Sequence, residues 1–525
     1  MSSSSSTFIS SSVAPRDAPC SPRDADISWV LIATVLVLGM LPGLAFFEAG
    51  LVRGKNTISI TVQVFSGAVV LSCMWIFFGF SLSFAHDSTN SFIGNLNHVL
   101  LIDISYTDCY PGTVIPSMLY CLFQMMFAAI TPLLMTGAFA ERLAWRPFIL
   151  LMCFWELLVY YPVAHWVWHP QGWLKAMGAQ DYAGGIVIHI TAGVASLVSV
   201  LVLGQRQDFA KHHGDAPYSS LPVACIGATL LWTGWFGFNG GCALAAGRTA
   251  IYAVVNSQIG ATVCSCCFLL FQLRKTGKPS IIAIINGAVA GLAGITPTAG
   301  FISPVAAILL AILLAFAAQV GIFVLKHRLM IDDALDVSSV HGITGFVGAL
   351  FIGIAGDASI GGANGVVFGG SARLLGVQLL ACVVCAAWSA VWTFAILKVI
   401  SFFFVLRVDE AVEKGGLDLL ENGEVAWLVE KVTPNTSFAI VPLRTTSRIE
   451  DDHEESLATL PGEPLEKKRA SKHDSTTDDR GDASRQRSSL RRKSIKENQA
   501  FNEAVLERAI LVVGSEEAQR NRTLQ

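Results

Sequence analysis

The sequence Asp181-Tyr-Ala-Gly-Gly-Ile-Val-Ile-His189 opens a long apolar segment, with an acid at its mouth and a histidine in its middle. His189 follows Asp181 by eight positions, which corresponds to about 12 Å along an α-helix. The hydrocarbon core of a bilayer is roughly 30 Å thick, so we expect the imidazole near the midplane. An ionisable group at that depth is costly, and its presence favours a functional role.

The second half of the chain repeats this arrangement. His341 follows Asp333 by eight positions and opens a similar segment of small residues. Glycine lies four positions after each histidine, at Gly193 and Gly345, and small residues at helical spacing let membrane helices approach closely. One such histidine is compatible with a packing residue. Two in matched positions favour a transporter built from internal repeats, with its site at mid-depth.

The composition places the chain among integral membrane proteins. Hydrophobic residues make up 53% of the sequence and charged residues only 14%, which excludes an ordinary soluble protein. Most of the 12 cysteines lie inside apolar runs, and no paired CxxC motif suggests a zinc site. Cys20 and Cys109 fall in polar segments and are candidates for a disulfide. The Ser-rich first 26 residues lack the pattern of a cleaved signal peptide.

Eleven apolar segments are long enough to be transmembrane helices. They lie near residues 27–49, 57–84, 113–140, 147–167, 184–204, 221–243, 250–273, 279–297, 303–325, 337–355 and 374–406. Lysine and arginine concentrate in alternate loops, for example at Arg53, Arg142, Arg206, Arg274 and Lys326. The positive-inside rule then predicts an extracellular N-terminus and a cytosolic C-terminus.

This topology predicts an all-α polytopic membrane protein with an inverted repeat of five plus five helices. The fifth span enters from outside, so Asp181 faces the exterior, whereas the tenth enters from the cytosol with Asp333 and Asp336. Both histidines should therefore meet at mid-depth from opposite sides. The eleventh span falls outside the repeat, and we expect it to strap the bundle.

Aromatic side chains concentrate at the predicted exterior ends of three spans. Phe127 lies in the third span, Trp168 ends the fourth, and Phe238 lies near the end of the sixth. An interfacial aromatic belt is one interpretation, and we favour it for Trp166 and Trp232. Three spans that bring aromatics to one level can also form a cation–π cup for a small cation, worth about 2 kcal/mol or more when desolvated.

Five motifs follow one another along residues 27 to 427: Phe46-Phe-Glu48-Ala-Gly-Leu-Val-Arg53, Gly137-Ala-Phe-Ala-Glu141-Arg142, Asp181-Tyr-Ala-Gly-Gly-x-x-x-His189, Gly234-Trp-Phe-Gly-Phe-Asn and Asp336-Val-x-x-x-His341-Gly. Together they resemble the ammonium transporter family (Amt/Mep/Rh), and the extended tail is similar to the fungal branch. The resemblance implies an eleven-helix bundle, a homotrimer with one pore per protomer, and ammonium transport across the plasma membrane. Methylammonium would serve as an analogue.

The same resemblance assigns roles to particular residues. Trp168, Phe127, Phe238 and Cys242 would recruit ammonium at the outer site, where the family often has serine in place of Cys242. Phe127 and Phe238 would also gate the pore. His189 and His341 would line the pore that neutral ammonia crosses after ammonium loses its proton. Asp181 would hold the outer vestibule and favour the cation, and an additional role as a helix N-cap is compatible with this.

The resemblance also divides the chain into four parts. Residues 1–26 form an extracellular segment, 27–406 the transmembrane domain, 407–430 a cytosolic segment shared with the family, and 431–525 a mostly disordered regulatory tail. Asn422 replaces a histidine that the family usually carries. Three tail serines in basic contexts are candidates for a regulatory kinase: Ser488, Ser489 and Ser494. No cofactor, metal or nucleic acid is implied, and membrane lipid is the surrounding partner.

Three rival functions remain at this stage. An intramembrane metal enzyme would need a third ligand at the depth of the histidines, but Asp181 and Asp333 lie at opposite faces. An ammonium sensor, with or without transport, is compatible with the tail. A channel for neutral ammonia or carbon dioxide differs from an ammonium transporter in carrying no current.

Overall fold

A computed structural model describes residues 22–210 and 217–426 of the 525-residue chain. Helices dominate the described part, where the only β-type pairings are two isolated bridges, Cys109 with Pro116 and Leu143 with Arg407. Ten of the described helical stretches are long and apolar enough to cross a membrane. The all-helical membrane fold expected from the sequence is therefore confirmed.

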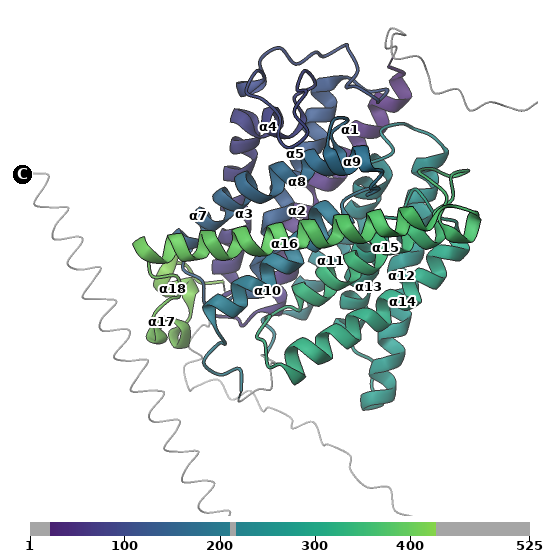
Figure 1. The fold of residues 1–525 in the computed structure, drawn as a ribbon. Coiled ribbons are helices and arrows are strands. Elements are labelled where there is room, and N and C mark those ends of the chain that lie inside the picture. The colour runs from purple at the N-terminus through teal and green to yellow at the C-terminus, as the bar shows by residue number, and fades with distance from the viewer. Residues whose placement is uncertain (1–21, 211–216, 427–525) are drawn as a thin grey trace, which may run out of the picture. The chain divides into compact units, whose positions relative to one another are not determined.

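The first five predicted spans correspond to the stretches α1–α2, α3–η1–α4, α5–α6, α7–η3–α8 and η4–α10 (Figure 1). Their bounds are α1 Asp24–Leu38, α2 Met40–Leu51, α3 Thr57–Met74, η1 Trp75–Gly79, α4 Phe80–Phe84, α5 Ser117–Leu133, α6 Thr136–Phe139, α7 Trp145–Trp155, η3 Glu156–Tyr160, α8 Tyr161–Trp168, η4 Gly185–Ile190 and α10 Thr191–Leu203. Here η1, η3 and η4 are π-helical turns.

The second half contains the six remaining predicted spans. Their bounds are α11 Leu221–Gly241, α12 Arg248–Thr276, α13 Ile281–Ile295, α14 Pro304–Ile322, η5 Phe323–Arg328, η6 Ser338–Ile343, α15 Thr344–Ala355 and α16 Ala372–Phe403. Short helices lie in the connections and after the last span: η2 Val99–Leu101, α9 Trp173–Met177, η7 Val366–Phe368, α17 Glu410–Gly415 and α18 Leu417–Glu421.

Helix α13 is the one predicted span that falls short of the length of a crossing. It has 15 residues, against the roughly 20 that a straight transmembrane helix needs. Its C-terminal half is buried from Gly287 to Ile295, because it packs against α12, α14 and α15. The count of eleven crossings therefore stays a prediction.

Matching helices of the two halves pack against each other. Helix α2 packs on α11, which opens the second half, and α10 packs on η6 while α15 packs on η4. At this crossing a Cβ on Gly193 would lie 2.3 Å from the Cα of Gly342. The two helices that carry the histidines can approach this closely only because both positions are glycine.

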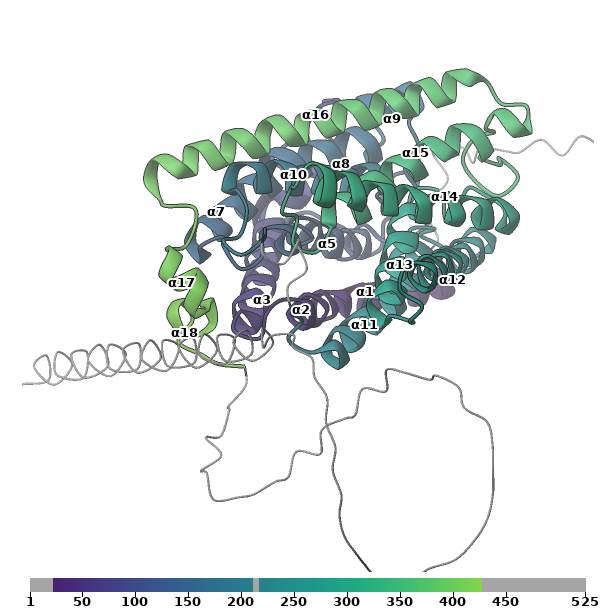
Figure 2. The same cartoon turned by 90° about the horizontal axis from the view of Figure 1, so that it is seen from below.

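Helix α16 runs across one side of the bundle in both views (Figure 1, Figure 2). It packs against α7 and α10 from the first half and against α15 from the second. Its 32 residues exceed the length of a straight crossing, as expected for a helix that lies obliquely over its neighbours.

The described cysteines inside the bundle are not joined by disulfide bonds. Ten described cysteines are free, whereas Cys109 forms a disulfide bond. Cys20, the partner that the sequence suggests for Cys109, lies outside the described residues.

Candidate functional site

Two aspartates cap the two broken helices that carry the histidines. Both carboxylate oxygens of Asp181 accept hydrogen bonds, from the backbone amides of residues 184 to 187 at 2.7 to 3.0 Å. Asp333 accepts equivalent bonds from Val337 at 3.0 Å and Ser338 at 2.7 Å. The N-cap position of η4 is Gly184, but Asp181 satisfies the first free amides as an N-cap side chain would, and Asp333 does the same in the second half.

The backbone between each aspartate and its histidine is not the continuous α-helix that the spacing predicted. Residues 185–190 and 338–343 are π-helical turns, and Asp181 and Asp333 precede them in irregular backbone. A π-turn widens the helix and often marks a functional position.

Burial raises the pKa of Asp181 to about 6, although four backbone amides donate to it.

The two imidazoles meet inside the bundle. His341 Nδ1 lies 3.2 Å from His189 Nδ1, and the ring centroids are 5.1 Å apart. Both side chains are buried, and Nε2 of His189 has no hydrogen-bond partner. A hydrogen bond between two Nδ1 atoms requires a proton on one of them only. The pair can therefore share one proton and still leave ring nitrogens free for a small polar molecule.

Aromatic rings extend from His189 toward Trp168. Phe238 lies 6.2 Å from His189 between ring centroids, Phe127 lies 4.4 Å from Phe238, and Trp168 lies 6.1 Å from Phe127. Phe127 and Phe238 are fully buried, and Trp168 is half-buried. The structure thus brings the predicted aromatic residues and the histidine together in one column.

The Trp168 end of this column is tied to Asp181. Trp168 Nε1 donates a 2.9 Å hydrogen bond to the backbone carbonyl of Asp181. Burial, with the nearby carboxylate of Asp181 as a second cause, raises the pKa of the Cys242 thiol well above its ordinary value. The thiol of Cys242 is therefore neutral, and a thiol is a weaker hydrogen-bonding group than a hydroxyl.

Trp235 is a site residue that the sequence analysis did not assign. Its ring stacks on His189 at 5.7 Å and an interplanar angle of 25°. Its Nε1 donates to Thr296 Oγ1 at 2.9 Å, which fixes the ring. The Gly234-Trp-Phe-Gly-Phe-Asn motif contained this residue, but only the fold shows which ring faces the imidazole.

Three cavities follow one another from the aromatic column past the histidines. The first, of about 20 Å³, is lined by Phe238, Trp235 and both histidines. The second, also of about 20 Å³, shares His341 with the first and is lined by Glu48 and Asn286. The third, of about 70 Å³, shares Asn286 and Leu335 with the second. The two smaller cavities each have room for about one water-sized molecule.

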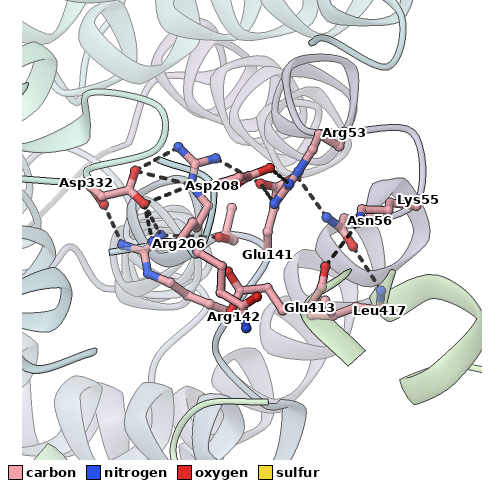
Figure 3. Close-up of polar contacts among 12 residues, drawn as sticks. Arg53, Lys55, Asn56, Glu141, Arg142, Arg206, Asp208, Asp332, Glu413 and Leu417 are labelled. Atoms are coloured by element: carbon pink, nitrogen blue, oxygen red, sulfur yellow. Dashed lines mark hydrogen bonds and ion pairs between the residues drawn. The ribbon is translucent and has the colours of Figure 1, made fainter. Parts of the chain in front are cut away.

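A buried ion cluster joins loops that the sequence predicts to lie on one side of the membrane (Figure 3). Arg206 forms ion pairs with Glu141 at 2.9 Å and Asp332 at 2.7 Å. Arg53 pairs with Glu141 at 2.7 Å, and Arg142 lies 3.6 Å from Asp332. Burial opposes ionisation of Glu141, but hydrogen bonds from Arg53 and the charge of Arg206 lower its pKa to about 2.

The segment after α16 docks on the same loops. The backbone amide of Leu417 donates to Asn56 Oδ1 at 2.9 Å, and Asp418 accepts from the amide of Ser59 at 2.8 Å. Asn422 lines a surface cavity with Trp145. Local sequence patterns do not predict these contacts, because they depend on which loop the segment reaches.

The interfacial aromatic belt expected from the sequence is wrong for Trp166. Trp166 is not in a lipid-facing belt: it is 4% exposed, and its Nε1 donates to the carbonyl of Phe92 at 2.8 Å. Trp232 is half-buried and donates to Gln258. The tail serines Ser488, Ser489 and Ser494 lie outside the described residues.

No group of three or more His, Cys, Asp or Glu side chains in residues 22–210 and 217–426 is arranged to hold a metal ion. The histidine pair thus lacks the third protein ligand that zinc sites have.

Comparisons with known proteins agree with these features. Residues 28–427 match the ammonium transporter family. Ammonium transporter 1 of Dictyostelium discoideum is 52% identical over 426 residues, which cover 80% of this chain and 91% of that protein. The crystal structure of Candida albicans Mep2 is 34% identical, with a TM-score of 0.69, and the match covers 74% of this chain and 87% of Mep2. A solved structure named Sensor Amt Protein is 28% identical, with a TM-score of 0.69, over 76% of this chain and 98% of that one. The chain is an ammonium-transporting membrane protein rather than an enzyme, and it belongs to the ammonium transporter family.

Proposed function

We propose that this protein moves ammonium through a pore that only the neutral molecule can enter. Ammonium is captured beside Trp168, loses its proton, and passes as ammonia between Phe127 and Phe238 to the histidine pair. The observation that carries the proposal is the contact between His189 and His341 beside a cavity for about one small molecule. The cavity wall is otherwise apolar.

Selectivity follows from this arrangement. Ammonium and potassium have similar size and charge, so an electrostatic pore would pass both. Moving a cation into an apolar cavity costs several kcal/mol or more. Ammonium alone can avoid that cost by giving up its proton, and the imidazoles then offer ammonia both a donor and an acceptor.

Replacing Trp168 with leucine should weaken capture of ammonium without disturbing the pore. The substitution removes a cation–π face worth about 2 kcal/mol, which corresponds to a roughly 30-fold higher half-saturation concentration. The maximal rate should change little. Trp392→Leu is a matched control, because Trp392 is half-buried against Trp388 and lies outside the aromatic column. Uptake measured over a range of ammonium concentrations tests this, and an unchanged half-saturation concentration would reject the outer site.

The orientation in the plasma membrane is part of the proposal. The lysine and arginine bias supports an extracellular N-terminus and a cytosolic C-terminus. Because Cys109 is disulfide-bonded, it is unsuitable as a reporter, so single cysteines are introduced at Tyr106 and Val425, which are 75% and 49% exposed. In a background without the exposed Cys73 and Cys266, an impermeant thiol reagent should label position 106 in intact cells and position 425 only after lysis. The reverse pattern would invert the topology.

A homotrimer and a regulated tail complete the proposal. Phosphorylation at Ser488, Ser489 or Ser494 would add roughly −1.5 to −2 charge beside neighbouring arginines. An additional sensing role is supported by the similarity to the solved structure named Sensor Amt Protein. Measuring uptake and signalling in the same cells would separate transport from sensing.

A further inference from the structure

The second cavity contains a carboxyl group to which neither the sequence analysis nor the proposed pore gives a role. Glu48 lies on α2 and is 2% exposed. It lines the cavity that begins at His341 and ends at Asn286 and Leu335. The remaining wall is apolar, formed by Leu44, Phe47, Leu134, Val289, Val337 and Val340. The polar groups in this cavity are therefore His341, Glu48 and Asn286.

The side chain of Glu48 is held in place from the far side. Thr136 Oγ1 donates a 2.6 Å hydrogen bond to Glu48 Oε2. A Cβ on Gly137 would lie 2.8 Å from Glu48 Oε1, so glycine at this position leaves the carboxyl the space it occupies. These contacts fix the group at the cavity wall while one face remains toward the cavity.

The next cavity has the opposite character. It is lined by Arg206, Lys326 and Asp336, and Lys326 pairs with Asp336 at 2.7 Å. A molecule leaving the pore thus passes from an apolar cavity into a charged one. Ammonia can remain neutral in the first environment, and an ion costs far less in the second because charged side chains line it. The change of protonation state should occur before the molecule leaves the apolar cavity, whose wall contains Glu48.

We infer that Glu48 is the group that returns a proton to ammonia at the exit of the pore. This inference rests on the proposed function. A carboxylic acid donates its O–H proton to the nitrogen lone pair, so an N–H bond forms and an O–H bond breaks. Ammonium leaves toward Asp336, and the carboxylate remains. Water takes the proton that ammonium releases at the outer site. The proton then passes through the histidine pair and a further water molecule to the carboxylate, so one positive charge crosses per ammonium.

Glu48 is the carboxyl group that lines this cavity among the described residues. Helices α1, α3 and α11 pack on α2. Helices α3 and α11 carry cysteine as their only ionisable side chain, at Cys73 and Cys225, and α1 carries Asp24 and Asp26 in its first turn, neither of which lines the cavity. His341 is the titratable group that shares the cavity among the described residues. The charged residues Arg206, Lys326 and Asp336 face the neighbouring cavity.

A purely structural role is the alternative, in which Glu48 only ties α2 to the turn at Thr136. The two roles differ in what they do to charge transport. The experiment reconstitutes the full-length protein in liposomes and measures, in one preparation, electrical current and uptake of isotope-labelled ammonium. Glu48→Gln keeps the size and the acceptor for Thr136 but has no proton to give. Glu156→Gln is the matched control, because Glu156 is fully buried in η3 and lines none of the three cavities.

In Glu48→Gln the charge carried per labelled nitrogen should fall at least about tenfold, in line with the loss of a positioned proton donor. Glu156→Gln should keep the wild-type ratio. An unchanged ratio in Glu48→Gln would overturn the inference. If Glu48→Gln passes neither charge nor nitrogen while its thermal stability is normal, Glu48→Asp decides. If Glu48→Asp keeps the wild-type charge per labelled nitrogen, proton donation is supported, because the carboxyl is kept. If Glu48→Asp also loses transport, Glu48 has only a structural role and the inference is overturned.

Failure of the inference is distinguishable from failure of the proposed function. If wild-type protein takes up no ammonium in this assay, the proposed function is wrong. If wild-type protein transports ammonium with one charge per nitrogen and Glu48→Gln does the same, only the role of Glu48 is wrong.

Discussion

Replacing His189 or His341 with alanine is expected to abolish selective ammonium transport. Each substitution leaves the other imidazole buried without the partner that now lies 3.2 Å away. An unpaired buried polar group costs about 1–3 kcal/mol, which corresponds to roughly 5- to 150-fold in rate if the cost falls on the transport step. Water that fills the space left by alanine can alternatively admit potassium. Each single variant should therefore lose uptake or lose discrimination.

The double variant should be little worse than either single one, because the two rings act as one unit. Ammonium-dependent growth of a transporter-deficient host, with potassium flux measured in parallel, checks both outcomes. His327→Ala is a suitable control, since His327 is exposed at the end of η5. Normal uptake and normal selectivity in both single variants would reduce the pair to packing residues.

Replacing Arg206 with alanine is expected to cause a large loss of stability. Arg206 is 6% exposed and holds Glu141 and Asp332 together (Figure 3). Its removal takes away the cation that both buried carboxylates share and leaves Glu141 with Arg53 and Asp332 with Arg142. Breaking a buried ion pair in this way costs about 3–5 kcal/mol. Thermal unfolding in detergent should show this as a markedly lower midpoint. Lys414→Ala is the control, because its pair with Glu410 is exposed and should leave the midpoint within experimental error.

The same cluster predicts how stability depends on pH. The pKa of Glu141 is lowered from 4.5 to about 2 in the folded protein. A lowered carboxyl pKa adds stability above the unfolded value, and this stability is lost as pH falls through the folded value. The wild-type midpoint should therefore decline between pH about 4.5 and about 2, with a smaller decline in Arg206→Ala. Equal declines in the two proteins would show that the cluster contributes nothing.

The sequence was sufficient for the helices and for the pairing of the histidines. Long apolar runs end at charged loops because charges are excluded from the hydrocarbon, so the boundaries of most spans agree with the structure within a few residues. The matched spacing of His189 and His341 from their aspartates was informative because the same local structure recurs in both halves. The hydrogen bonds of Asp181 and Asp333 and the π-helical turn that contains each histidine occur in both halves.

Features that depend on distant parts of the chain could not be predicted from local patterns. Trp166 lies at the end of a span like an interfacial residue, but the 85–116 loop covers it through Phe92. Nothing near Glu48 in the sequence shows that Thr136 and Gly137 lie against it. The partners of Arg206 lie 65 and 126 positions away, so the composition of each loop alone did not reveal the cluster.

The central claim is that the pore passes ammonium by letting only its neutral form through. The most direct measurement reconstitutes the purified protein in liposomes and compares ammonium with potassium at equal concentration and equal membrane potential, recording current and isotope uptake. The account predicts transport with ammonium and none above empty liposomes with potassium. A potassium current comparable to that with ammonium, from protein of normal thermal stability, would contradict it.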